Sequence, residues 1–203
     1  MTQPDFDDII VGAGSSGAVL AARLSEDRNR KVLLLEAGPD YASLAATPAD
    51  ILGPDVSLRA HDWRMRSLTL ATGKRFAFPR GRVVGGSSSV NGAVALRGVP
   101  ADYEEWVNLG NSEWSWQNVL PYFKKLEDDD LGPSDLHGRG GPIPVRRTRP
   151  EHFCATQAAA HESFKSLGFA EVVDHNDPES TGVGPIPLNV RDNIRISTAI
   201  GYL

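Results

Sequence analysis

The chain has 203 residues, 40% of them hydrophobic and 23% charged, and a formal net charge of −5. This length and balance are typical of a globular protein that buries a substantial core, and they exclude a disordered or fibrous chain. The acidic balance provides no basic field, so we expect no nucleic-acid partner.

The sequence shows no targeting or membrane segment. Residues 1–8 lack the basic start and apolar stretch of a signal peptide. No run of about 18 apolar residues occurs, so we expect no membrane-spanning helix. The single Cys154 cannot form an internal disulfide. Together these features favour a cytoplasmic location.

The first predicted unit is a strand, a turn, a helix and a second strand. Residues 9–11, Ile-Ile-Val, form a short β-branched run that predicts a strand buried on both faces. The sequence Gly-Ala-Gly-Ser-Ser-Gly follows over residues 12–17, and residues 18–24 are rich in helix formers. Residues 32–35 predict the second strand, which ends at Glu36.

This unit has the chemistry of a dinucleotide site. Gly12 permits the tight turn, Gly14 lets the backbone approach a pyrophosphate, and Gly17 allows close packing of helix on strand. The start of the helix offers unpaired N–H groups and the positive end of its dipole. Glu36 lies about 20 residues on, where an acid binds free ribose hydroxyls and repels a 2′-phosphate. The pattern predicts FAD or NAD and disfavours NADP; the alternative is a structural glycine turn in an unrelated α/β domain.

Residues 41–61 show no sustained helix or strand pattern, which is typical of a segment that is functional or covers a cofactor. At its end, we expect His61 to be a hydrogen-bonded loop residue and Trp63 a packed aromatic.

Residues 80–92 form a second informative stretch, with a basic start, a glycine pair, three serines and an asparagine. Such a segment offers open backbone and short hydrogen-bonding side chains to a ligand. A flexible linker is the alternative. Apolar residues at 83–84 and 93–96 flank the stretch and favour a loop that enters the core.

Several motifs in order resemble one family. They are the GAGSSG turn followed by LLLEAG, then PRGRVVGGSSSVNG, LRG, ADYEEW, NVLPYFKKLE, the turn from His137 to Pro142, and Arg195-Ile196-Ser197 near the final Tyr202-Leu203. This series resembles the N-terminal half of the glucose–methanol–choline (GMC) oxidoreductases, flavoproteins that oxidise alcohols.

The resemblance implies FAD as the cofactor. The cofactor-binding residues that it implies are Gly12, Gly14, Ser15, Ser16, Gly17, Glu36, Ala37, Val83, Ser87, Asn91, Gly92, Ala93 and Val94. The first five belong to the pyrophosphate turn, Glu36 meets the adenosine ribose, and the residues from Val83 onward line the diphosphate and isoalloxazine. Members with covalent flavin carry a histidine immediately before the asparagine. Val90 occupies that position here, so we expect non-covalent FAD.

The middle of the chain predicts a packed second layer. A helix is expected from Pro100, with Asp102 favourable near its start. Trp114 and Trp116 are expected to be packing anchors and not a ligand cage. The acids at 127–130 lack spaced metal-ligand partners, so we expect a solvated loop and no metal site.

The following residues predict one strand and one helix. Residues 143–147 have strand character, and their proline predicts an edge strand. Residues 152–167 have helical composition and Gly168 is placed to end the helix. We expect His161 to be a surface or satisfied core residue without a ligand role.

The expected fold is α/β: a Rossmann-like FAD-binding domain with a parallel central sheet over residues 1–142, which includes the irregular segment 39–80 and the flavin loop 81–98. The start of a substrate-binding α+β domain is expected over residues 143–203. The fold is incomplete relative to the family, so unpaired sheet edges and uncovered apolar surface are expected.

The resemblance implies an FAD-dependent oxidoreductase that moves a hydride from an alcohol carbon to flavin N5. The family's catalytic histidine belongs to a C-terminal half that this chain lacks, so no catalytic residue is assigned and we expect the chain alone to be inactive. The expected partners are a small-molecule alcohol and a complementing C-terminal chain or an electron acceptor. The alternatives are a non-catalytic nucleotide-binding subunit that needs a partner chain, and an NAD-dependent oxidoreductase.

Overall fold

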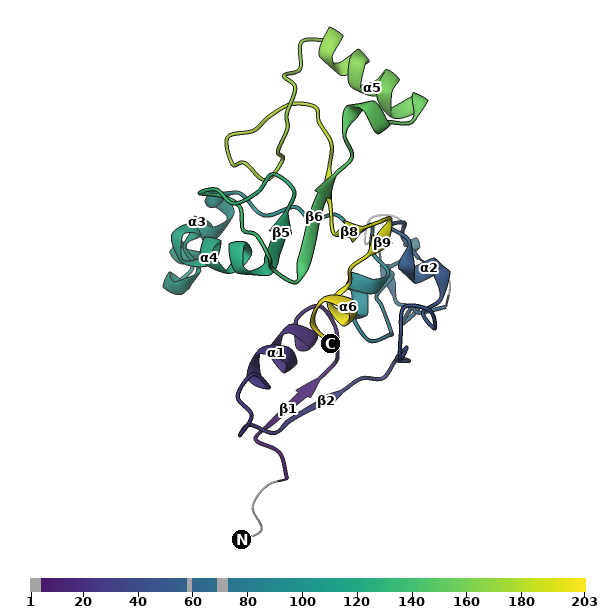
Figure 1. The fold of residues 1–203 in the computed structure, drawn as a ribbon, viewed down its shortest axis with the longest axis vertical. Helices are drawn as coiled ribbons and strands as arrows, with labels where there is room; N and C mark the ends of the chain where they lie inside the picture. The colour runs from purple at the N-terminus through teal and green to yellow at the C-terminus, as the bar shows by residue number, and fades with distance from the viewer. Residues whose placement is uncertain (1–4, 58–59, 69–72) are drawn as a thin grey trace. The chain divides into compact units, whose positions relative to one another are not determined.

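The structure is a computed structural model that describes residues 5–57, 60–68 and 73–203. The chain divides into two compact units (Figure 1). Unit 1 comprises Met1–Ala93 and Val190–Leu203, and unit 2 comprises Val94–Asn189. The boundary between functional domains expected after residue 142 stays a prediction.

Unit 1 begins with the predicted strand–helix–strand arrangement. Strand β1 (Asp8–Val11) pairs in parallel with β2 (Val32–Leu35), and α1 (Gly17–Leu24) connects them (Figure 1). Val11 lies opposite Leu35 at the carboxyl end of the pair. The loops that follow the two strands therefore start at the same edge of the sheet, which is where ligands of open α/β sheets bind.

The expectation that β1 is buried on both faces is wrong. Ile9 is 63% exposed and Val11 84% exposed, whereas Ile10 is half-buried on the face toward Gly17 of α1. Among the described residues, β2 is the only strand that pairs with β1. The apolar run was interpreted as a fully buried strand, but only α1 covers it. The expected uncovered apolar surface and unpaired edge are confirmed.

The remainder of unit 1 holds short elements around a small apolar core. Ile51, Val83 and Val90 form this core, and Tyr41 packs against it. Segment 41–61 is irregular apart from one helical turn, as expected, and residues 58–59 lie outside the described part. The elements are α2 (Ala49–Leu52), β3 (Arg66–Leu68) antiparallel to β4 (Arg75–Ala77), the 3-10 turn η1 (Gly86–Ser89), β8 (Val190–Arg191) antiparallel to β9 (Ile194–Arg195), and α6 (Thr198–Tyr202).

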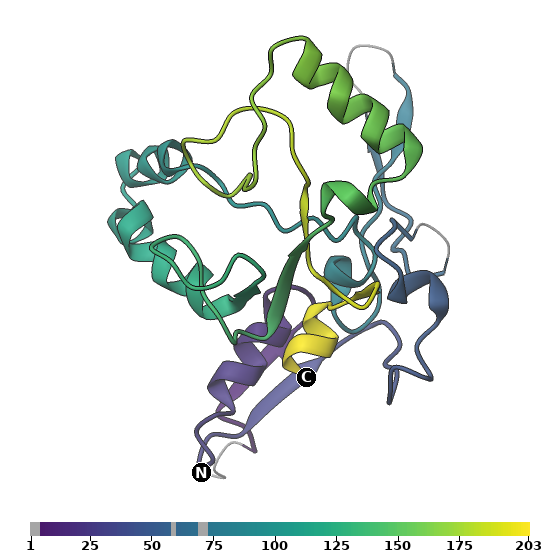
Figure 2. The same cartoon turned by 45° about the horizontal axis from the view of Figure 1, so that its top comes forward.

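The last helix returns to the first. Figures 1 and 2 both show α6 beside α1, although the two helices lie at opposite ends of the sequence. The Arg23 guanidinium of α1 lies 5.5 Å from the Tyr202 ring centroid. The C-terminal segment is therefore part of the nucleotide-binding unit predicted at the N-terminus.

Unit 2 contains an aromatic cluster on three consecutive helical elements. These are α3 (Pro100–Asn108), the 3-10 turn η2 (Ser112–Trp114) and α4 (Trp116–Leu126). The Asp102 carboxylate accepts a hydrogen bond from the Val99 N–H at 2.9 Å, which caps α3 as expected. Ring centroids lie 5.3 Å apart for Trp106 and Trp114 and 5.6 Å apart for Tyr103 and Trp116. Trp116 is therefore a packing anchor as predicted, whereas Trp114 contacts Trp106 but is 50% exposed.

The sheet of unit 2 corrects two expectations. Residues 127–129 form strand β5 (Glu127–Asp129), not a solvated loop, and β5 pairs in parallel with β6 (Ile143–Arg147). β6 also pairs with β7 (Pro187–Leu188) and is the middle strand, not an edge strand. The proline in β6 is tolerated because β7 pairs only with Arg146 and Arg147, beyond Pro144.

The expected helix of unit 2 is confirmed. A 3-10 turn, η3 (Pro150–His152), precedes α5 (Ala155–Ser166), and Gly168 follows with φ +90°, in the left-handed region that ends helices. His161 is buried, with its ring centroid 5.5 Å from that of Phe153. Over the residues described, no helix has the length and apolar character needed to cross a bilayer.

Candidate functional site

The loops that follow β1 and β2 meet the glycine–serine segment at one cleft within unit 1. The cleft has a volume of about 620 Å³. Backbone and short side chains form much of its wall, with one acid, one arginine and one tryptophan. Its lining residues are Val11, Gly12, Gly14, Ser15, Leu35, Glu36, Ala37, Trp63, Met65, Arg80, Gly81, Gly86 and Ser87.

The glycine turn has the geometry that its sequence predicts. Gly12 has φ +94°, which disfavours any residue with a side chain. A Cβ on Gly17 would lie 1.9 Å from the Gly12 carbonyl oxygen, so only glycine allows α1 to start so close to the turn. The described residues provide no backbone acceptor for the N–H groups of Ser15 and Ser16. These donors are available to an anion at the helix start.

Glu36 braces the turn at the end of β2. One carboxylate oxygen accepts a hydrogen bond from the Ala13 N–H and the other from the Gly38 N–H, each at 2.8 Å. Each carboxylate oxygen can accept a second hydrogen bond. Glu36 can therefore hold the glycine turn and still accept hydroxyl donors from a ligand in the cleft.

The glycine–serine segment packs against this turn through backbone. The Gly85 N–H donates to the Ala13 carbonyl oxygen at 2.7 Å. Gly86 has φ +53°, and a Cβ on it would lie 2.7 Å from the Gly14 Cα. The linker alternative for residues 80–92 is therefore wrong, because the segment is packed and largely buried.

The C-terminal segment contributes residues that the sequence-based assignment missed. The Thr198 N–H donates to the Ser88 Oγ at 3.0 Å, and Arg195 Nη1 donates to the Asn91 Oδ1 at 2.6 Å. In the sequence, only the family resemblance indicates residues 195–197. No local sequence feature predicts that they lie beside a loop more than a hundred residues earlier, because this position results from long-range packing.

The structure brings some of the predicted cofactor-binding residues together in the cleft lining and places others elsewhere. Gly12, Gly14, Ser15, Glu36, Ala37 and Ser87 line the cleft. Ser16 and Gly17 lead into α1, and Val83 is 1% exposed and part of the core. Asn91, Gly92 and Ala93 follow η1, where Asn91 Oδ1 accepts from the Ala93 N–H at 2.9 Å. Val94 begins unit 2.

The prediction for His61 is confirmed, whereas the prediction for Trp63 is wrong. His61 is 5% exposed, and its Nε2 lies 2.6 Å from the Tyr41 hydroxyl, so the expected hydrogen-bonded role is confirmed. Trp63 is 46% exposed and lines the cleft, so it is not the packed aromatic that was expected. The Arg82 guanidinium lies 5.2 Å from its ring centroid. Trp63, Met65 and Arg80 are cleft residues that sequence reasoning missed.

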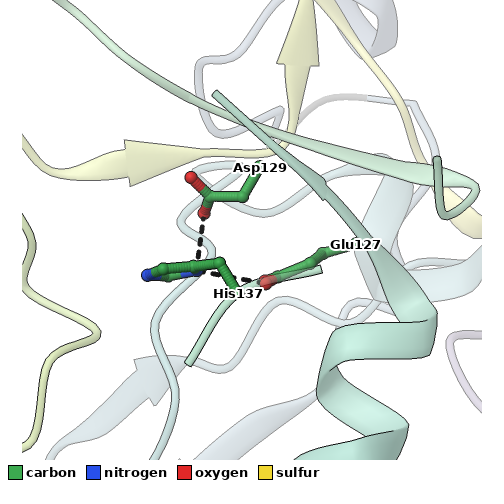
Figure 3. Close-up of side chains that lie close together, drawn as sticks. All are labelled: Glu127, Asp129 and His137. Carbon is green, nitrogen blue, oxygen red and sulfur yellow. Dashed lines mark hydrogen bonds and ion pairs between the residues drawn. The ribbon is translucent and has the colours of Figure 1, made fainter. Parts of the chain in front are cut away.

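A second candidate site lies in unit 2, where one histidine and two acidic side chains come close together. The Nδ1 of His137 lies 3.1 Å from both the Glu127 Oε1 and the Asp129 Oδ2 (Figure 3). Possible ligand atoms of these three residues all lie within 4.8 Å of one another, close enough for one metal ion. The cluster also contains cationic partners: Arg97 pairs with Glu127 at 2.5 Å and Arg147 with Asp129 at 2.7 Å.

The protonation of this cluster favours ion pairing over metal binding. Hydrogen bonds to Asp129, Asp174 and Glu127 raise the pKa of His137 to about 11, so the imidazole carries a proton on each nitrogen. Burial opposes ionisation of Asp129, but bonds from His137 and Arg147 outweigh it and hold the pKa of Asp129 below its usual range. Three carboxylates therefore face three cations. The acids at 127–129 are structural ion-pair partners and not the solvated residues that were expected.

Comparisons with known proteins show which family this chain resembles over its length. The GMC oxidoreductase family profile matches residues 6–203. An uncharacterised GMC-type oxidoreductase of Rhodococcus erythropolis is 43% identical over 100% of this chain and 41% of its own length. The 5-(hydroxymethyl)furfural oxidase of Methylovorus sp. is 37% identical over 100% of this chain and 40% of its own length.

A solved structure gives the same result. The crystal structure of pyridoxine 4-oxidase from Mesorbium loti matches with a TM-score of 0.88 and 38% identity, over 98% of this chain and 39% of that one. The chain thus spans about two fifths of the length of these relatives. Together with the cleft between the glycine turn and the glycine–serine loop, these matches show that the chain belongs to the GMC oxidoreductase family.

Proposed function

We propose that this chain is the FAD-binding portion of an oxidoreductase that acts on the CH–OH group of a small-molecule alcohol. The observation that carries the proposal is the shared cleft: the glycine turn, Glu36 and the glycine–serine loop all line it. These three features are separate in the sequence, and each was expected to meet the same cofactor.

The residues present fit FAD. The N–H groups of Ser15 and Ser16 lack a backbone acceptor among the described residues, so the turn offers free donors to a diphosphate, and the close approach of Gly86 to Gly14 leaves no room for a side chain beside it. We assign Gly12, Gly14 and Gly17 with Ser15 and Ser16 to the diphosphate, and Glu36 with Ala37 to the adenosine. Val83, Ser87, Asn91, Gly92, Ala93 and Val94 are assigned to the diphosphate and isoalloxazine.

The cofactor is proposed to be held without a covalent bond. Val90, at the position of the histidine that binds flavin covalently in some members, offers no nucleophile and is 4% exposed in the core with Ile51 and Val83. When bound, FAD supplies the hydride acceptor, flavin N5. We assign no catalytic acid or base, and we propose that the chain alone does not turn over alcohols.

The wider organisation follows from the same proposal. Residues 1–142 are assigned to the FAD-binding domain and residues 143–203 to the start of a substrate-binding domain, whose last segment, Val190–Leu203, packs in unit 1. Relatives named as oxidases of 5-(hydroxymethyl)furfural and pyridoxine support an alcohol substrate. The proposed partners are an alcohol substrate and either a complementing C-terminal chain or an electron acceptor.

Reconstitution tests the cofactor. The 203-residue chain, mixed with excess FAD and freed of unbound FAD by gel filtration, is expected to keep a visible flavin spectrum. Denaturation should release all of the colour into the supernatant, as non-covalent binding requires. A colourless protein with no measurable FAD affinity would contradict the proposal.

Two controls separate the alternatives. NAD should not displace FAD at equal concentration; preferential binding of NAD would favour the NAD-dependent oxidoreductase. ADP should compete with FAD, because both share the half that meets Gly14 and Glu36. A Gly86→Val variant should lose both ligands, because its side chain would enter the contact with Gly14.

A further inference from the structure

Arg195 on β9 is a fully buried cation whose hydrogen-bond partners are all uncharged. Its exposure is 0%. Nη1 donates to the Asn91 Oδ1 at 2.6 Å and to the Ser88 carbonyl oxygen at 3.3 Å, and Nη2 donates to the Asp55 carbonyl oxygen at 2.7 Å. Nε is buried without a hydrogen-bond partner in the part of the chain that the structure describes. Within that part, no carboxylate forms an ion pair with Arg195.

This arrangement is energetically costly without a nearby anion. Burial disfavours the cationic form and lowers the pKa of Arg195 from its ordinary value, and the charge of Asp55 opposes this only in part. The guanidinium stays charged because an arginine does not deprotonate in proteins. The buried arginines of unit 2 differ, because Arg97 and Arg147 each contact carboxylates. Among the residues described, Arg195 is therefore a buried positive charge in unit 1 that the charge of Asp55 offsets only in part.

The charge lies beside the loop that lines the cleft. Arg195 bonds to Ser88 and Asn91, and Ser87, next in sequence to Ser88, lines the cleft. Thr198, three residues beyond Arg195 at the start of α6, donates its hydroxyl to the Gly14 carbonyl oxygen at 3.5 Å. The Asn91 Oδ1 accepts from both Arg195 and the Ala93 N–H, which fixes its amide. One side chain thus holds the loop and places positive charge next to it.

We propose that Arg195 is a positioning residue for the diphosphate of the bound dinucleotide: it fixes residues 88–91 against the glycine turn, and its buried positive charge attracts the diphosphate into the cleft. The inference rests on the proposed function, since it requires a diphosphate at Gly14. Arg195 itself is not part of the cleft lining, so its electrostatic effect acts through the low-dielectric interior.

The test compares ADP with adenosine, which lacks the diphosphate, in calorimetric titrations of the 203-residue chain. Arg195→Met should weaken ADP about tenfold or more and adenosine less than about twofold, because only ADP carries the opposing charge. Arg191→Met is the matched control: Arg191 is exposed on β8 of the same hairpin and loses the same formal charge. It should change ADP affinity less than about twofold, because solvent screens its charge.

Two further variants separate charge from packing. Arg195→Lys keeps the charge but loses hydrogen bonds, so it should recover most of the preference for ADP over adenosine. Asn91→Asp leaves Arg195 in place and puts a carboxylate beside Nη1, so ADP should weaken about tenfold while the fold is retained. This variant keeps the test decisive if Arg195→Met does not fold.

The outcomes distinguish the two proposals. If the wild-type chain binds neither FAD nor ADP, the proposed function is wrong. If it binds ADP and Arg195→Met behaves like Arg191→Met, the role of Arg195 is wrong while the proposed function stands. Equal weakening of ADP and adenosine in Arg195→Met and Asn91→Asp would show a purely structural residue and overturn the inference.

Discussion

The buried charged groups of the two units differ in whether they contact a partner of opposite charge. In unit 1, the region around the cleft is built from glycine backbone and neutral hydrogen bonds, and its one fully buried arginine lacks a carboxylate partner among the residues described. In unit 2, buried charges are saturated: His137 contacts Glu127, Asp129 and Asp174, while Arg97 and Arg147 hold the same carboxylates.

The difference indicates which unit is built to receive a ligand. In the ion-pair network of unit 2 each charge already lies beside charges of opposite sign, and breaking such a network is costly. In unit 1 the free N–H groups of the glycine turn and a buried arginine without an ion-pair partner among the described residues favour the binding of an anion. A cluster of titratable residues is therefore not by itself a binding site; the state of its partners decides.

The largest effect is expected from a substitution at Gly17, where unit 1 leaves no space for a side chain. A Cβ there would lie 1.9 Å from the Gly12 carbonyl oxygen, so Gly17→Ala must move α1 or the turn. We expect a loss of more than about 4 kcal/mol in the free energy of unfolding, measured by urea denaturation followed by circular dichroism, and loss of ADP binding. Gly53→Ala is the control, because its Cβ would have ordinary contacts. A stable, ADP-binding Gly17→Ala variant would contradict the geometry of the turn.

The second-largest effect is expected from a substitution at His137, which tests whether the ion pairs of unit 2 stabilise the fold. His137→Ala leaves three buried carboxylates with one cation fewer, and we expect a loss of about 3 kcal/mol in the free energy of unfolding. Tryptophan fluorescence reports it, because Trp106, Trp114 and Trp116 all lie in unit 2. His152→Ala, at an exposed histidine, should change stability by less than about 0.5 kcal/mol. ADP affinity should stay unchanged, as expected of a structural network.

The pH dependence of unit 2 gives a third, graded effect. The folded pKa of His137 is about 11 against an ordinary 6.5, so folding favours its protonated form. Its contribution is complete below about pH 6.5 and is lost as the pH rises toward 11. Burial opposes ionisation of Asp174, but hydrogen bonds led by His137 lower its pKa to about 2, so its contribution is present above about pH 3.8 and lost as the pH falls toward 2. Urea midpoints should therefore decline above pH 6.5 in the wild type and decline less in His137→Ala; equal declines would exclude His137 as the cause.

The smallest effect concerns Glu36. Glu36→Gln keeps one acceptor oxygen for the Ala13 or the Gly38 N–H but cannot serve both as the carboxylate does. We expect about 1 kcal/mol lower stability and several-fold weaker adenosine binding, measured by denaturation and calorimetry. Glu26→Gln, at an exposed acid at the end of α1, is the matched control and should affect neither. Unchanged adenosine affinity in Glu36→Gln would remove Glu36 from the ribose site.

Sequence patterns were sufficient where the determinant is local. The turn at residues 12–17, the position of Glu36 directly after β2 and the helix end at Gly168 follow from backbone sterics and spacing, and the structure confirms them. The role of Glu36 at a ribose stays a prediction. The patterns were insufficient where the partner is distant. The acids at 127–129 were expected in solvent because their partners, Arg97, His137 and Arg147, are scattered over fifty residues. Trp63 was expected to be packed, but it lines the cleft.

By itself, the sequence determined the strand–turn–helix–strand unit, because glycine positions and strand–helix periodicity act within a few residues of one another, and its series of motifs indicated the family. Only the tertiary structure decided which charges are neutralised and which are left open. It placed Arg195 beside Asn91 without a carboxylate and His137 among three of them. Electrostatic environment depends on residues brought together from distant positions, and burial there fixes whether a charged group stabilises the fold or remains available to a ligand.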